Sequence, residues 1–176
     1  MKKLSLFVFY VVLFVVIIVV LSPKRYLYNF AEHTALQEKI IFSHEKIHDK
    51  LFFLEVSNAD IYVQDIFIGS FEKMTVYPFI FFNQVTCKDF GSSKDIENFF
   101  STSIDTASFF QWMGEPYKIR MNMQGSFGSA SGFVQLKERK VYVKIQPAKS
   151  FISQLDKLNI GVKKGDGGEY IYEYGY

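Results

Sequence analysis

The segment Tyr117–Ile145 reads YKIRMNMQGSFGSASGFVQLKERKVYVKI and decides the fold. At its start, apolar residues alternate with charged or amide residues, and the same alternation returns in VYVKI at its end. Successive side chains of a β-strand point to opposite faces, so this period of two predicts strands with one buried and one wet face. The charged run Lys137–Lys140 between two such strands is typical of a hairpin turn.

Two further features predict that the sheet bends. Gly125–Gly132 is a run of small residues, which allows a sharp turn or a close approach of backbones. Pro78 interrupts a series of strand-like segments between Leu51 and Val85, and proline cannot donate a ladder hydrogen bond. The predicted fold class is therefore mainly β, with a single N-terminal transmembrane helix followed by a curved antiparallel sheet and one or two short helices.

Helices are expected at three places outside the membrane segment. Apolar residues at helical spacing predict an amphipathic connector at Lys24–Lys39, and a short helix is expected around Lys94–Phe100. The wider segment Asp95–Trp112 fits helix or strand. Ser150 is a good N-cap for the third helix. The C-terminal EYIYEYGY, residues Glu169–Tyr176, predicts a tyrosine-rich strand.

The segment Leu4–Leu21, LSLFVFYVVLFVVIIVVL, carries no charge. A helix of this length reaches roughly 27 Å at about 1.5 Å per residue, close to the thickness of a bilayer's hydrocarbon core. The run is longer than the core of a signal peptide, and no small-residue cleavage site follows it, so an uncleaved anchor is favoured. The side chains taken to mark the membrane-spanning segment are Leu4, Phe7, Val11, Phe14, Val19 and Leu21.

This anchor predicts a domain organisation and a location. The expected parts are a tail at 1–3, the span at 4–21, a helical connector at 22–50 and a β-rich domain at 51–176. Basic residues flank both ends of the apolar run, so charge alone does not orient it, but long C-terminal domains translocate largely regardless of charge. The predicted location is the bacterial inner membrane, as a single-pass protein with its C-terminal domain in the periplasm.

Composition narrows the function classes. The chain has 176 residues and one cysteine, Cys87, so no internal disulfide can form, and a buried apolar position is the default for its thiol. The formal net charge is +2, and no basic cluster interleaved with aromatic residues occurs, so direct readout of nucleic acid is not expected. Gly125–Gly132 lacks the lysine of a phosphate-binding loop, and no cofactor is expected.

The sharpest match to a catalytic motif is His44-Glu45-Lys46-Ile47-His48. In H-E-x-x-H, a helix places both histidines on one face to bind zinc, and the glutamate acts as general base. Lys46 places a cation inside the motif, and no third ligand follows at the usual spacing. The preferred interpretation of this stretch is therefore the solvated face of a connector, and His44, Glu45 and His48 remain only minor candidates for metal binding. The chain is not expected to be an enzyme.

The aromatic content admits two interpretations. The chain has 20 Phe and 11 Tyr, which either fill the core or form an exposed apolar surface for lipid or a protein partner. The alternating tyrosines of the C-terminal strand are a candidate edge for strand addition by a partner. These residues are Tyr170, Tyr172, Tyr174 and Tyr176.

The C-terminal half resembles a known family. The segment that carries the resemblance is IRMNMQGSFGSASGFVQLKERKVYVKIQPAKSFISQLDKLNIGVKKGDGGEYIYEY. Its features follow in the order strand, small-residue bend, strand, charged turn, strand, proline, short helix, Lys/Gly turn and Tyr-rich end. With the earlier IYVQDIFIGSFEKMTVYP and the N-terminal anchor, it resembles the type II secretion system protein N (GspN) family. It is also similar to the AsmA-like and LptC-like periplasmic proteins.

The resemblance implies a non-enzymatic accessory component of an envelope machine. Such a machine is a type II secretion, type IV pilus or DNA-uptake system. The expected partners are the lipid bilayer, through residues 4–21, and other inner-membrane secretion or competence proteins. The alternative is a lipid-handling module with a concave sheet, for which lipid is the partner. The minor alternative is a zinc hydrolase at His44, Glu45 and His48.

Overall fold

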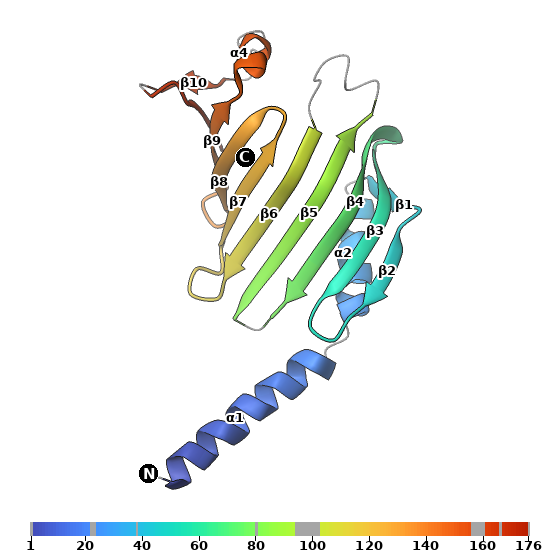
Figure 1. Ribbon diagram of the computed structural model, residues 1–176, viewed down its shortest axis with the longest axis vertical. Coiled ribbons are helices and arrows are strands. Elements are labelled where there is room, and N and C mark those ends of the chain that lie inside the picture. Colours follow the sequence, from blue (N-terminus) through green and yellow to red (C-terminus); the bar gives the residue numbers. More distant parts are fainter. Residues whose placement is uncertain are drawn as a thin grey trace.

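The computed structural model describes residues 2–21, 24–37, 39–79, 81–93, 103–155, 161–165 and 167–175. Two helices open the chain, β-strands follow, and a short helix interrupts the strands near the C-terminus (Figure 1). The elements are α1 Lys2–Leu21, α2 Lys24–Gln37, β1 Ile40–Ser43, β2 Lys46–Asp49, β3 Leu54–Val63, β4 Ile66–Pro78, β5 Phe82–Ser92, β6 Ser103–Trp112, β7 Lys118–Gly125, β8 Gly128–Gln135, β9 Lys140–Pro147, α4 Lys149–Leu155, β10 Lys163–Lys164 and β11 Tyr170–Gly175.

The strands form one antiparallel sheet of eleven strands. Its order is β1-β3-β4-β5-β6-β7-β8-β9-β11-β10, with β2 pairing β3 beside β1. From β3 to β9 each strand pairs with the next in sequence, so hairpins alone build most of the sheet. The predicted antiparallel sheet is thus present, and Figure 1 shows it curving, with β8 and β9 turned out of the plane of β4–β6.

Several local predictions are confirmed. The charged turn joins β8 to β9, with Lys140 as the first residue of β9, and β4 ends at Pro78. The third expected helix is present, but α4 begins at Lys149, so Ser150 lies inside the helix and is not its N-cap. The small-residue run forms the β7–β8 turn, where Gly128 has a φ of 114° that favours glycine. Residues 103–112 of the ambiguous segment are strand β6. The helix expected around 94–100 lies outside the described residues.

The register of the sheet gathers apolar side chains on one side, which we call the apolar face. Each strand alternates, and the pairing keeps these alternations in phase from strand to strand. One row across the sheet is Leu54, Val76, Val85, Phe109, Met121, Gly132, Val143 and Tyr172. The next row is Val56, Met74, Cys87, Ala107, Met123, Ala130, Ile145 and Tyr170.

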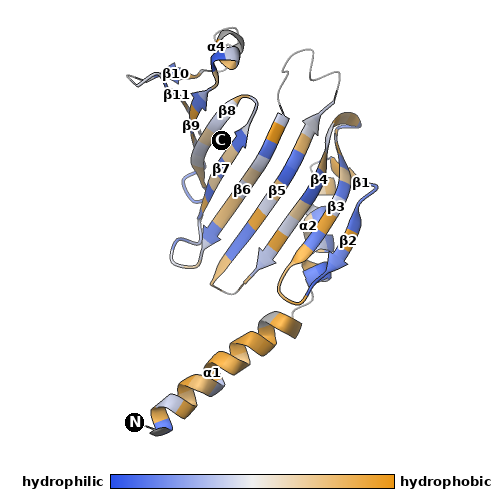
Figure 2. Ribbon diagram, viewed as in Figure 1, coloured by the Kyte–Doolittle hydropathy of each residue, from blue (hydrophilic) through white to orange (hydrophobic). Residues whose placement is uncertain are grey.

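The opposite side of the sheet is predominantly polar. The row between the two apolar rows is Glu55, Thr75, Thr86, Ser108, Asn122, Ser131, Lys144 and Ile171. Figure 2 shows this alternation as hydrophobic and hydrophilic bands along the strands. A sheet of this kind buries only one face, so the core must lie against the apolar face.

Helix α2 covers one end of the apolar face. Tyr28 of α2 forms the core cluster with Leu54, Val56, Ala59 and Phe71. Leu54 is 1% exposed and Val56 is fully buried, and they are the largest fully buried side chains of the described residues. The helix contacts β1 and β2 at the edge of the sheet, and β5–β9 have no helix across their apolar face among the described residues (Figure 1).

The alternation of apolar and polar side chains shifts by one residue at a line of positions across β3–β6. Asn58 and Asp89 have φ values of 55° and 53°, a conformation that asparagine and aspartate tolerate better than most residues. The strand pairing skips one residue on each of these strands, and the skipped residues lie opposite one another across β3–β6. They are Asn58, Glu72, Asp89 and Asp105. The shift returns Ala59 to the apolar face, three positions after Val56 rather than two or four.

The connector prediction is only partly confirmed. The amphipathic helix expected at Lys24–Lys39 is present as α2, which ends at Gln37. The rest of the expected 22–50 connector instead forms β1 and β2. These four-residue strands have little strand pattern of their own, and pairing with β3 fixes their conformation. Tertiary pairing therefore overrode the local helical spacing.

The membrane prediction requires correction. Among the described residues, no helix combines the length and hydrophobicity that crossing a membrane requires. The structure therefore supports neither the transmembrane helix of the predicted fold class, at 4–21, nor the predicted single-pass location in the inner membrane. Leu4, Phe7, Val11, Phe14 and Leu21 of the expected span lie on α1 with exposed side chains, and Val19 lies on the same helix.

Candidate functional site

An apolar groove lies where α2 leaves the sheet uncovered. It has a volume of about 340 Å³ and opens between one side of α2 and strands β4 and β5. Its lining from the helix and β1 is Lys24, Leu27, Tyr28, Ala31, Glu32, Ala35 and Phe42, and its lining from β3–β5 is Leu54, Met74, Val76, Pro78 and Val85. We call this the α2 groove.

Small residues on α2 explain why the groove exists. Ala31 and Ala35 lie one turn apart and face the groove, where each presents only a methyl group. The sheet opposite presents Met74, Val76 and Val85, which do not reach far enough to fill the gap. The helix therefore packs well over β3 and leaves a hollow over β4 and β5.

Tyr28 places a polar atom inside this apolar site. Its side chain is 8% exposed, and its hydroxyl is buried without a hydrogen-bond partner. Burial raises the pKa of Tyr28 well above its usual value, with smaller contributions from Glu45 and Glu32. The group is therefore a neutral hydroxyl at physiological pH. A buried hydroxyl without a partner costs free energy, typically about 1–3 kcal/mol, so a ligand oxygen that accepted its hydrogen bond would be stabilised there.

Lys24 adds a positive charge at the start of α2. Its side chain is 3% exposed, and its Nζ lies 3.7 Å from Asp49 Oδ1 of β2 and 3.4 Å from the backbone oxygen of Val20. The stem of the lysine lines the groove while the ammonium group is held by oxygen atoms. This end of the groove is therefore the polar end, and the end at Met74 and Val85 is apolar.

The groove continues into the uncovered part of the apolar face. Val85 lines the groove and pairs with Phe109, which in turn pairs with Met121. Beyond Met121 the same row reaches Val143 and Tyr172. The site is thus a helix-covered pocket at one end of a long apolar surface.

A second hollow is larger but chemically mixed. It has a volume of about 470 Å³ near the β8–β9 turn. Glu138, Lys140 and Glu173 line it together with Tyr142 and Tyr174. Its charges have opposite signs, and Lys140 already lies 3.7 Å from Glu138, so it is a weaker candidate for a binding site than the α2 groove.

The zinc-motif residues do not lie on a helix. His44 and Glu45 form the turn between β1 and β2, and His48 lies in β2. His44 has a φ of 62°, and its Nδ1 lies 3.0 Å from Asp60 Oδ2 of β3. The helical geometry that H-E-x-x-H requires is therefore missing. Among the described residues no group of three or more potential ligands is close enough to hold a metal ion.

The C-terminal tyrosines lie on a strand that is only partly open. β11 pairs with β9 along its length, and on its other side β10 pairs only with Tyr170 and Ile171. Tyr172 and Tyr174 stack with their centroids 6.3 Å apart and extend the apolar face. Tyr176 lies outside the described residues. The edge of β11 from Tyr172 onward has no strand beside it in the described part of the chain.

Sequence reasoning missed the α2 groove. Cys87 lies on the apolar face, where it is half-buried rather than fully buried as the sequence predicted. The alternation of the strands predicted an apolar face, and the small residues Ala31 and Ala35 were visible in the helix. What the sequence did not show is where α2 lies on the sheet, and that position alone creates the hollow.

Comparison with known proteins gives no guide to this site, since no family model, no curated protein and no solved structure matches the chain.

Proposed function

We propose that this protein binds the hydrocarbon chain of an amphiphile, such as a fatty acid or lipid, in the α2 groove and along the adjoining apolar face. The observation that carries the proposal is the continuity of the α2 groove with the apolar rows of β5–β9. A surface that is apolar over this many strands and lacks a covering layer in the described structure is typical of a binding surface.

The size and lining of the groove suit this ligand class. Ligand pockets are commonly about 300–1,000 Å³, mostly apolar, with a few polar groups that fix orientation. The α2 groove, at about 340 Å³, falls at the small end of that range. A flexible chain that continues from the pocket onto the open face needs no larger cavity.

Tyr28 and Lys24 suit the polar end of such a ligand. The hydroxyl of Tyr28 can donate a hydrogen bond to a carbonyl or carboxylate oxygen, and the positive charge of Lys24 favours an anionic group nearby. A hydrocarbon with no polar group would leave the hydroxyl unpaired. We therefore favour an amphiphile over a plain hydrocarbon.

The direct test fills the groove without opening the core. Ala35→Phe places a ring where only a methyl group lines the hollow. Thr34→Phe adds the same ring at the neighbouring exposed position and serves as the matched control. Binding of spin-labelled stearic acid to the full chain is then measured by electron paramagnetic resonance, in which immobilised label broadens the spectrum.

The expected result is immobilised label with the unmodified chain and with Thr34→Phe, and at least a tenfold weaker affinity with Ala35→Phe. All three chains carry the same α1, so its exposed apolar residues contribute equally to each measurement. Equal binding by the two phenylalanine variants would overturn the assignment to the groove. Failure of the unmodified chain to immobilise the label would overturn the proposed function.

A second candidate function is assembly through strand addition, as a non-enzymatic component of a secretion or competence machine. The open edge of β11 beyond Ile171 supports it, because an unpaired strand edge can pair with a strand of a partner. Gly165 N–H donates to Glu169 O, so alternate residues of β11 from Glu169 onward direct their backbone groups away from β9. Glu173→Pro therefore removes a backbone donor at the open edge and should abolish recovery of partner components after cross-linking. Recovery of the same components with that variant would contradict the proposal.

A further inference from the structure

The loops at one end of the sheet carry most of the exposed large apolar side chains of the β-domain. Because consecutive strands run antiparallel, the β2–β3, β4–β5, β6–β7 and β8–β9 connections all lie at this end (Figure 1). Eight of the ten such residues in the described part of 39–175 lie here, and we call them the loop rim. They are Leu51, Phe52, Phe81, Trp112, Met113, Tyr117, Leu136 and Tyr174.

The opposite end of the sheet lacks a comparable surface among the described residues. The other two exposed large apolar residues, Ile66 and Phe67, follow the β3–β4 turn there. Scattered exposed apolar residues are normal on protein surfaces, whereas a gathering at one end needs an explanation. The gathering of exposed apolar side chains in neighbouring loops therefore points to an interaction at the loop rim.

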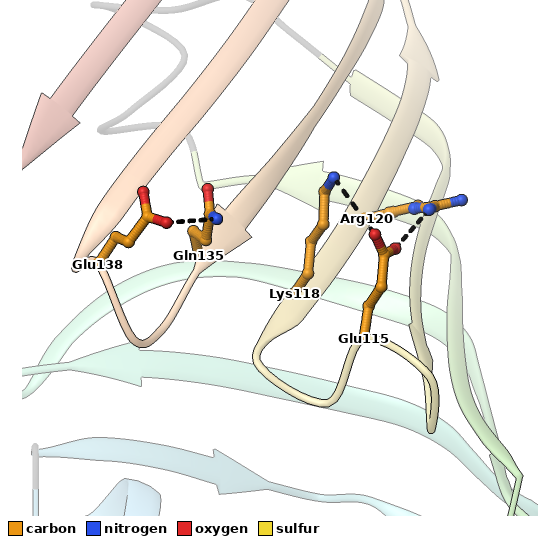
Figure 3. A network of polar contacts seen from close by, with 5 residues as sticks. All are labelled: Glu115, Lys118, Arg120, Gln135 and Glu138. Atoms are coloured by element: carbon orange, nitrogen blue, oxygen red, sulfur yellow. Dashed lines mark hydrogen bonds and ion pairs between the residues drawn. The ribbon is translucent and has the colours of Figure 1, made fainter.

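Backbone hydrogen bonds join neighbouring loops of the rim. Met113 N–H donates to Phe81 O at 2.9 Å, and Leu136 N–H donates to Tyr117 O at 2.8 Å. Figure 3 shows the charged contacts beside them, where Glu115 bridges Arg120 and Lys118. The β4–β5, β6–β7 and β8–β9 loops are thus tied together, and their large apolar side chains are exposed.

Aromatic rings contact one another beside this surface, in the β2–β3 and β4–β5 connections and at the adjoining strand ends. Phe79 and Phe82 have centroids 4.8 Å apart, and Phe82 lies 5.9 Å from Phe110. Phe53 and Tyr77 lie 5.3 Å apart beside them. The exposed side chains of the rim are therefore continuous with a cluster of packed aromatic rings.

The rim loops carry three basic residues and two acidic residues. Lys50, Lys137 and Arg139 lie in these connections. The acidic residues of the same loops are already engaged. Figure 3 shows Glu115 with Arg120 and Glu138 with Gln135. Glu138 also lies 3.7 Å from Lys140 Nζ. A surface with exposed tryptophan, tyrosine and phenylalanine beside basic side chains matches the interface of an anionic lipid bilayer.

We propose that the loop rim docks on the surface of a lipid bilayer, with its aromatic side chains in the headgroup region and its basic side chains against anionic headgroups. Tryptophan and tyrosine favour this region because each has an apolar ring and a polar group that stays wet. This docking requires no segment to cross the bilayer. It is separate from chain binding in the α2 groove, and each can fail without the other.

Trp112 supplies the test, because it is the only tryptophan of the chain and lies in the rim. The full chain is mixed with vesicles of phosphatidylcholine and phosphatidylglycerol, with brominated lipids as quenchers and iodide as the aqueous quencher. We expect the emission of Trp112 to shift to shorter wavelength, to be quenched by bromine, and to be protected from iodide. If the protein sediments with vesicles while Trp112 stays open to iodide and unaffected by bromine, the rim is not the docking surface.

Two matched variants distinguish docking through the rim from non-specific binding of exposed apolar residues to vesicles. Met113 is 61% exposed in the rim and Ile66 is 59% exposed at the opposite end. Met113→Glu should weaken the Trp112 response to vesicles about tenfold, since burying one large apolar side chain contributes about a decade in affinity. Ile66→Glu should leave it unchanged. Equal effects of the two variants would overturn the proposal. It would also be overturned if Trp112 were protected from iodide without vesicles, because a second copy or another protein would then cover the rim.

Discussion

Lys24 Nζ of α2 lies 3.7 Å from Asp49 Oδ1 of β2, and this ion pair joins the start of the helix to the edge of the sheet. The lysine is almost fully buried whereas Asp49 is partly exposed. Because Asp49 is exposed to water, the attraction between the two charges contributes little to stability. The carboxylate nevertheless gives the buried ammonium group of Lys24 a partner, and a buried charge without a partner would destabilise the fold.

Asp49→Asn should therefore lower the free energy of unfolding by about 1 kcal/mol, because the amide keeps the size of the side chain but not its charge. The measurement is urea unfolding followed by circular dichroism. Asp65→Asn, in the exposed β3–β4 turn, is the matched control and should have almost no effect. Equal stabilities of the two variants would show that the ion pair does not hold α2.

The packing of α2 depends on Leu54, which is buried between the helix and the sheet. Leu54→Ala should lower the free energy of unfolding by about 2–5 kcal/mol, since the lost contacts leave a cavity. Leu51→Ala removes the same atoms from an exposed loop position and should cost less than about 0.5 kcal/mol. Similar losses from both variants would contradict the position of the core.

The buried hydroxyl of Tyr28 makes stability depend on pH in the alkaline range. Burial raises the pKa of Tyr28 in the folded protein, while the unfolded chain releases the proton near the usual value of about 10. The folded state thus binds more protons above that pH, and stability falls as pH rises. Tyr28→Phe should flatten this fall, and Tyr26→Phe, at an exposed position on the same helix, should not.

The same substitution should not harm the protein near neutral pH. Removing a buried hydroxyl that has no partner is neutral or stabilising, within about 1 kcal/mol. The free energies of unfolding of the Tyr28→Phe and Tyr26→Phe variants are compared by urea unfolding at several pH values. A large loss for Tyr28→Phe at neutral pH would mean that the hydroxyl has a partner, and the polar contact that we propose for a ligand would then be occupied.

Cys87 should react slowly with thiol reagents in the folded protein. Desolvation by burial raises the pKa of its thiol to about 11, from a usual value near 9. The thiolate is the reactive form, so at about pH 8 this difference alone slows labelling roughly a hundredfold. Labelling by a chromogenic disulfide is compared in native and urea-unfolded protein, and equal rates would contradict burial on the apolar face.

Much of the sheet could be predicted because its determinants are local. Alternation in KIRMNMQ and VYVKI, the charged turn at 137–140, and Pro78 each act over a few residues. The strands β1 and β2 could not be predicted, because their backbone follows β3 rather than their own side chains. His44 and His48 show the same limit, since an i, i+4 spacing has the expected meaning only on a helix.

The sequence by itself determined an antiparallel, mainly β domain with an apolar side to its strands, because a strand's own residues decide which face is apolar. Only the tertiary structure decided what that side is for. It placed α2 over one end of the sheet, so that Ala31, Ala35 and Val85 face a hollow rather than a packed neighbour. It also brought Phe81, Trp112 and Leu136 to one end of the molecule. Residues distant in sequence meet only when strand register and helix position are fixed together, and no local pattern records that arrangement.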